Sequence, residues 1–198
     1  MTPDPQDDLA YIRQVMEQTH RLTLMSGNYL IAWGVLISLG LACSGTVALT
    51  GAHLPLSAIW IGLVASGWAC SFWLGRREAR YLPVAGYATR LISWLWIACG
   101  AAMTTAFLIG GWTGAVPDTA SGGLSALFIG IAVFMTGMLS GMHWFRNLAV
   151  GWWAGAVAMF IWHGQASIWL CAGLFIALLV VPGVVLNIQA QALRKSVR

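Results

Sequence analysis

The sequence predicts an all-α, polytopic membrane protein with six transmembrane helices. Of its 198 residues, 59% are hydrophobic and only 8% are charged, and the charged residues lie outside six long apolar stretches. A soluble domain carries about 25% charged residues. A helix that crosses the ~30 Å hydrocarbon core of a bilayer needs roughly 20 mostly apolar residues. The composition therefore favours lipid over water as the surroundings of most side chains.

The six expected spans divide the chain into three regions. Residues 1–28 are expected to form a cytoplasmic amphipathic segment, residues 29–187 a six-helix transmembrane domain and residues 188–198 a cytoplasmic basic tail. The spans are placed at 29–49, 56–74, 91–110, 124–142, 148–162 and 168–186.

The N-terminal segment has the pattern of a helix start. Asp4 suits the N-cap and Pro5 the first helical position. Leu9 and Ile12 then fall on one face at ~100° per residue. These features predict an amphipathic helix over residues 5–23, which either lies on the membrane surface or docks a partner.

The basic residues fix the expected orientation. When the spans alternate across a bilayer, all ten Lys and Arg fall on one side, and the other side carries only the acid Asp118. The basic residues are Arg13, Arg21, Arg76, Arg77, Arg80, Arg90, Arg146, Arg194, Lys195 and Arg198. Basic loops stay in the cytoplasm, so both termini are predicted to be cytoplasmic.

The same charges indicate which partners to expect. Ten bases scattered over separate segments suit contact with membrane lipids and form no patch for nucleic acid. The preference for Arg over Lys, with abundant Ala, Gly and Trp, is typical of a GC-rich bacterial genome. We therefore expect the protein in a bacterial inner membrane.

Small residues at a spacing of four predict where the helices pack. Helices in lipid approach closely where Gly, Ala and Ser line a face. The predicted packing positions are Gly34, Ser38, Gly62, Ser66, Gly130, Gly137, Gly141, Gly151 and Gly155. Such faces can pack within the chain, between copies in a homo-oligomer, or against other membrane protein subunits.

Tryptophan recurs near the start of the odd-numbered spans, at Trp33, Trp94 and Trp152. One interpretation is a repeat of three tandem helical hairpins. The other is that Trp gathers at both bilayer interfaces in any membrane protein. Both interpretations remain open from the sequence.

Few side chains offer ligand chemistry. One possibility is a haem held by His53 and His163, but histidines at the membrane interface are favoured over it. Another is a copper(I) path along Met135, Met138, Met142 and His143, but ordinary packing of methionine side chains is favoured over it. Ser140 as a protease nucleophile is rejected, because His163 is expected at the opposite side of the membrane. The four cysteines lie within spans and form no CxxC pair. We expect no cofactor, no metal and no catalytic residue.

The N-terminal region resembles that of a family of small, largely uncharacterised bacterial membrane proteins with six spans. The resemblance rests on the amphipathic stretch 8–17, on Ser26-Gly27, and on Trp33-Gly34 at the start of the first span. Members of that family are often encoded beside small winged-helix regulators. The resemblance implies a role in membrane sensing or stress response and carries over no functional residue.

The predicted function follows from the spans, which contain no Asp, Glu, Lys or Arg. This absence favours a non-enzymatic membrane subunit or signalling and assembly scaffold. The alternative is a transporter or channel for an uncharged or apolar small molecule, and a third class, an enzyme or redox carrier, would have to use the histidines. The alternative transport path would be lined by Ser38, Ser44, Ser66, Thr104, Thr105, Thr136 and Ser140.

Overall fold

The computed structural model describes residues 27–79, 87–162 and 164–196, and every regular element among them is a helix. The all-α fold class is therefore confirmed. The helices are α2 (Gly27–Thr50), α3 (Leu56–Ala79), α4 (Tyr87–Thr104), α5 (Gly110–Trp112), α6 (Asp118–Ser140), α7 (His143–Ile161), α8 (Gln165–Phe175) and α9 (Val181–Ser196). The amphipathic helix predicted over residues 5–23 lies outside the described residues.

Two π-helical stretches join shorter helices end to end. The stretch η1 (Thr105–Ile109) continues α4 into α5, and η2 (Ile176–Val180) continues α8 into α9. Pro182 is the second residue after η2 and has no N–H to donate, and its ring would clash with the preceding turn of an ordinary α-helix. The wider π-turn, in which the Val181 N–H donates to the Ile176 carbonyl, takes up this misfit.

Five helical segments are long and apolar enough to cross a membrane, judged by length and composition. They are Gly27–Thr50, Leu56–Glu78, Tyr87–Trp112, Asp118–Ser140 and Gln165–Ala192. The fifth expected span corresponds to α7, which has 19 residues and is not among the five. Its first turns contain His143, Arg146 and Asn147, which lower its hydropathy. The count of six spans stays a prediction.

The helix ends differ from the expected span ends at several places. The expected loop 111–123 is shorter, because α6 already begins at Asp118 after the extended Pro117. The expected fourth span ends two residues early, at Ser140, because Gly141 adopts a left-handed conformation (φ 66°) that stops the helix. The charged residues of the described part of the chain therefore lie in terminal turns of helices.

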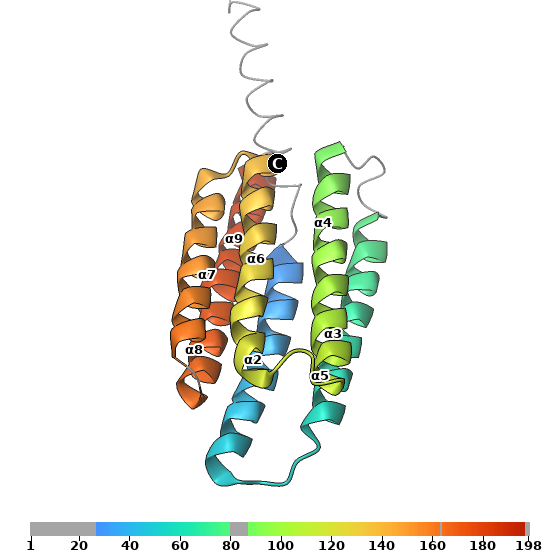
Figure 1. Cartoon of the computed structure of the whole chain (residues 1–198). Coiled ribbons are helices and arrows are strands. Elements are labelled where there is room, and N and C mark those ends of the chain that lie inside the picture. Colours follow the sequence, from blue (N-terminus) through green and yellow to red (C-terminus); the bar gives the residue numbers. More distant parts are fainter. Residues whose placement is uncertain (1–26, 80–86, 163, 197–198) are drawn as a thin grey trace, which may run out of the picture.

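The helices follow one another around a ring. Contacts run from α2 to α3, from α4 to α6, from α6 to α7 and from α7 to α8, and the α8–η2–α9 rod closes the ring on α2. Figure 1 shows α3 and α4 side by side at one edge, beside the group formed by α2, α6, α7, α8 and α9. Half of the apolar segment of α6 is buried, against 11% of α3 and 6% of α4. The pair α3–α4 is therefore peripheral.

The most extensive helix contact joins α6 to α7. Only Gly141 and Met142 connect the two helices, and a Cβ added at Gly137 would overlap the backbone nitrogen of Arg146. The absence of a side chain at Gly137 therefore lets the two backbones touch near the turn.

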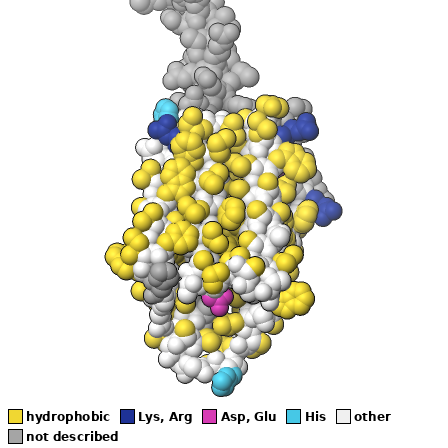
Figure 2. Space-filling view, viewed as in Figure 1, with side chains coloured by type: hydrophobic (Ala, Val, Ile, Leu, Met, Phe, Trp, Pro, Cys, Tyr) yellow, Lys and Arg dark blue, Asp and Glu magenta, His cyan; other side chains and the backbone are white. Residues whose placement is uncertain are grey.

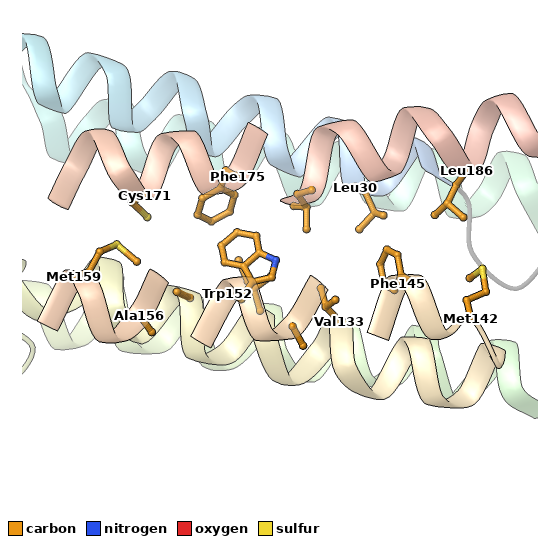
Figure 3. Close-up of a cluster of buried hydrophobic side chains, with 14 residues drawn as sticks. Leu30, Val133, Met142, Phe145, Trp152, Ala156, Met159, Cys171, Phe175 and Leu186 are labelled. Atoms are coloured by element: carbon orange, nitrogen blue, oxygen red, sulfur yellow. The ribbon is translucent and has the colours of Figure 1, made fainter. Parts of the chain in front are cut away.

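The core lies between the α6–α7 hairpin and the layer made by α2, α8 and α9 (Figure 3). Trp152 and Phe145 of α7 are fully buried, and the Trp152 ring meets Phe175 edge to face with ring centroids 5.1 Å apart. Leu30 and Leu186 come from the other layer. Edge-to-face aromatic contacts add stability beyond the burial of area.

Gly137 is expected to be sensitive to a single methyl group. Gly137→Ala should lower the stability of the protein in mild detergent by about 1–3 kcal/mol, because the added Cβ pushes α7 away from α6. Thermal unfolding of the purified protein measures the effect. Gly173→Ala is the matched control, since open space surrounds Gly173 and alanine favours a helix. Equal loss in both variants would contradict the close contact.

Candidate functional site

The basic residues of the described helices gather at one end of the bundle. Arg76 and Arg77 lie in the last turn of α3, Arg90 in the first turn of α4 and Arg146 in the first turn of α7. Because successive helices are antiparallel, these turns meet at the same end, which we call the basic end, and Figure 2 shows the dark blue side chains toward that end. Asp118 starts α6 at the opposite end.

The histidines and methionines that the structure describes do not form one site. His53 lies in the α2–α3 loop at the opposite end, while His143 starts α7 at the basic end. His163 lies outside the described residues. Across residues 27–79, 87–162 and 164–196, no group of three His, Cys, Asp or Glu side chains comes together.

The expected methionine stripe is divided between two surroundings. Met135 and Met138 are 40% and 52% exposed on α6, whereas Met142 is buried beside Phe145 and Leu186. Met142 therefore does not continue the exposed face on which Met135 and Met138 lie. The reason is the left-handed Gly141, which reverses the chain and turns Met142 into the core.

Most of the predicted packing positions lie against a neighbouring helix. Gly130 faces the Trp153 side chain of α7, and Gly151 and Gly155 face Leu178 and Leu174 of the last rod. Gly34 of α2 faces Val180, and the buried Ser38 hydroxyl donates to the Ala172 carbonyl (3.4 Å).

Three of the predicted packing positions have other surroundings. Gly62 and Ser66 are exposed on α3, and no other helix of the described chain comes within 4 Å of a Cβ built at Gly62. Gly141 terminates α6 and does not belong to its packing face. The four-residue spacing in the sequence showed which small residues share a helix face. It could not tell which face turns toward the bundle.

Four indole N–H groups donate to hydroxyl groups on a different helix. Trp33 and Trp60 link α2 and α3 reciprocally, Trp68 links α3 to α4, and Trp96 links α4 to α6. The bonds are Trp33 Nε1 to Ser71 Oγ (2.9 Å), Trp60 Nε1 to Ser44 Oγ (3.1 Å), Trp68 Nε1 to Thr104 Oγ1 (3.4 Å) and Trp96 Nε1 to Thr136 Oγ1 (3.0 Å). We call them the indole–hydroxyl bonds. They hold the peripheral pair α3–α4 to α2 and α6.

The hydroxyls proposed as a transport path already have partners. Those of Ser44, Thr136 and Ser140 donate to carbonyls one turn earlier in their own helices, at 2.7–2.9 Å, and Ser66 donates to Leu63 at 2.8 Å. This is the common state of Ser and Thr within apolar helices. Thr105 is the exception among the seven: its hydroxyl has no hydrogen-bond partner among the described residues, and it lies exposed on η1.

One indole differs from the four bonded ones. Trp152 is fully buried and its Nε1 has no hydrogen-bond partner among the described residues. Its ring instead packs between Phe175 and the aliphatic core (Figure 3). Trp33, Trp94 and Trp152 therefore have three different surroundings: Trp33 is partly buried, Trp94 is 65% exposed and Trp152 is enclosed.

Besides the indole–hydroxyl bonds, the structure contains another contact between distant segments that the sequence did not predict. Gly27 of α2 and Gly183 of α9 touch backbone to backbone, and the Asn187 amide donates to the Asn28 side-chain oxygen (2.8 Å). This contact joins the first and last described helices at the basic end. An asparagine at each end of the chain is the only signal for it, and asparagine is common in loops, so the pairing could not be deduced.

A shallow apolar groove runs between α2 and α3. Its lining residues are Ile31, Ala32, Val35, Leu36, Ser66 and Cys70. The Ser66 hydroxyl is the single side-chain polar group in that set and donates to its own helix. The groove offers no charged group for acid–base chemistry.

Comparison of the chain with protein-family models, with curated proteins and with solved structures gives no significant match.

The indole–hydroxyl bonds predict a measurable coupling between Trp96 and Thr136. In a double-mutant cycle of Trp96→Phe and Thr136→Val, the coupling free energy should be about 0.5–1.5 kcal/mol in detergent. Trp94→Phe replaces the Trp96 variant in the control cycle, since Trp94 is exposed and should show no coupling to Thr136. Additive effects of the Trp96 and Thr136 substitutions would show that no stabilising hydrogen bond joins the two side chains.

Proposed function

We propose that the chain is an integral membrane protein with six spans and both termini in the cytoplasm of a bacterium. A helix of 24 residues such as α2 or α3 is about 36 Å long, enough for a ~30 Å core. The α7 helix, with its arginine in the first turn, would have that turn in the headgroup region. The basic end then faces the cytoplasm, and the membrane is the inner membrane.

We further propose that it acts as a non-enzymatic subunit or scaffold. The observation that carries this proposal is that the interiors of the spans contain no Asp, Glu, Lys or Arg, so no charged group is available there for proton transfer or ion binding. The bonded hydroxyls support it further, since a polar path through the bundle would require them to turn from their present acceptors.

The surface of α3 is where we expect another membrane protein or a second copy to pack. Gly62 and Ser66 form a small-residue face there that no helix of the described chain covers. Small residues at this spacing are typical of helix association in lipid. The packing role predicted for these two residues would then be intermolecular.

The orientation can be tested by cysteine labelling. In a background without the four native cysteines, Thr119→Cys should react with a membrane-impermeant maleimide in intact cells from which any outer membrane has been made permeable. Ala79→Cys should react only after the inner membrane is opened. Thr119 adjoins Asp118 at the start of α6 and Ala79 ends α3, so the two lie at opposite ends. Reaction of Ala79→Cys alone in intact cells would reverse the orientation.

The scaffold role can be tested by the size of the assembly extracted from native membranes. The wild-type protein should be part of a stoichiometric complex larger than one chain, and Gly62→Leu should shift it to a smaller species while leaving the fold intact. Gly173→Leu is the matched control, because Gly173 is also exposed and has no neighbour within 4 Å. A single-chain wild-type protein would contradict the scaffold role and favour transport.

A further inference from the structure

The first turns of α7 place a cluster of hydrogen-bond donors at the basic end of the α6–α7 hairpin. The Arg146 backbone packs directly against Gly137 of α6, so the position of its side chain follows from a close contact between the two helices. The Arg146 Nε and Nη2 atoms donate to the Asn147 side-chain oxygen (3.3 and 3.1 Å), and Nη1 contacts the Met138 sulfur (3.9 Å).

The side-chain groups of Arg146 and Asn147 that remain without a hydrogen-bond partner are all donors. A guanidinium group has five N–H donors, and three of them are used by Asn147 and Met138. The Asn147 oxygen is occupied by the arginine, which leaves its two amide N–H groups free toward the surface. About four donors and one positive charge therefore remain available to a ligand.

No anion of the described chain neutralises this cluster. The hydrogen-bond partners of Arg146 include no carboxylate. Asp118 lies at the far end of α6, and Glu78 belongs to α3, which packs on α2. The start of α7 adds positive potential from the helix dipole, and its N-cap residue Met142 supplies no side-chain cap.

The surroundings of the cluster are partly apolar. Met138, under the guanidinium, is 52% exposed, and Trp144 is 37% exposed. In the bilayer placement proposed above, this surface faces lipid at the level where headgroups begin. Trp is the residue that favours this level.

We propose that Arg146 and Asn147 bind the phosphate of an anionic phospholipid. Arginine matches the oxygens of a phosphate with two parallel hydrogen bonds, and the Asn147 amide can donate to a third oxygen. Met138 and Trp144 accommodate the start of the acyl chains. Because the cluster is positively charged and its hydrogen-bond partners include no carboxylate, it repels the ammonium group of a zwitterionic headgroup, so phosphatidylglycerol is preferred to phosphatidylcholine. The proposal requires the bilayer placement but no protein partner.

The test is lipid binding to the purified full-length protein in mild detergent, followed by native mass spectrometry and by thermal stabilisation. Wild-type protein should retain phosphatidylglycerol in preference to phosphatidylcholine. Arg146→Gln should weaken phosphatidylglycerol binding about tenfold, because charge-assisted hydrogen bonds are lost. Arg90→Gln removes one charge from the same end and is the matched control, with binding expected near the wild-type value.

A second variant separates binding from folding. Asn147→Asp keeps an acceptor for Arg146 and adds the missing negative charge, so the fold should persist while phosphatidylglycerol binding falls as in Arg146→Gln. Wild-type binding in both variants, or an equal loss in Arg90→Gln, would overturn the site. Equal stabilisation by inorganic phosphate would show a site for a free anion and overturn the assignment to a lipid.

Discussion

The close approach of α6 and α7 at Gly137 is the contact on which the rest of the bundle depends. Between apolar helices in an apolar solvent no hydrophobic force favours association, so packing must come from surfaces that fit closely. Gly137 lets the two backbones touch, and the short Gly141–Met142 connection holds them in that register. Phe145, Trp152 and Met159 of α7 then project into the core, where the last helical rod and α2 cover them.

The two halves of the ring are held by different interactions. The group around α6 and α7 uses small residues and direct packing, as at Gly34, Gly151 and Gly155. The pair α3–α4 is attached through long tryptophan side chains whose N–H groups find hydroxyl acceptors on the next helix. In a low-dielectric setting such bonds specify partner and register because an unbonded N–H is costly. The peripheral pair can therefore be well oriented although little of its surface is buried.

The sequence predicts the all-helical fold and the approximate position of each helix, since both follow from hydropathy and length. It does not predict where the helices end, as the fourth span shows: the conformation of Gly141 decides whether Met142 joins the helix surface or the core. It also finds Gly62 as readily as Gly137, because spacing alone cannot tell which face has a neighbour. The indole–hydroxyl bonds join residues up to 40 positions apart and need the three-dimensional arrangement.

The contact at Gly137 also links the packing of the bundle to its surface chemistry. A larger residue there would displace the Arg146 backbone, and with it the guanidinium that lies over Met138 and bonds Asn147. The arginine that lowers the hydropathy of α7 thus occupies a position set by the core and not by a flexible loop. Among the described residues no carboxylate bonds this positive charge at the rim, so the guanidinium is available to an anion from outside. In the proposed bilayer the headgroup layer supplies that anion, which explains how an arginine one turn into α7 is compatible with the most tightly packed hairpin of the molecule.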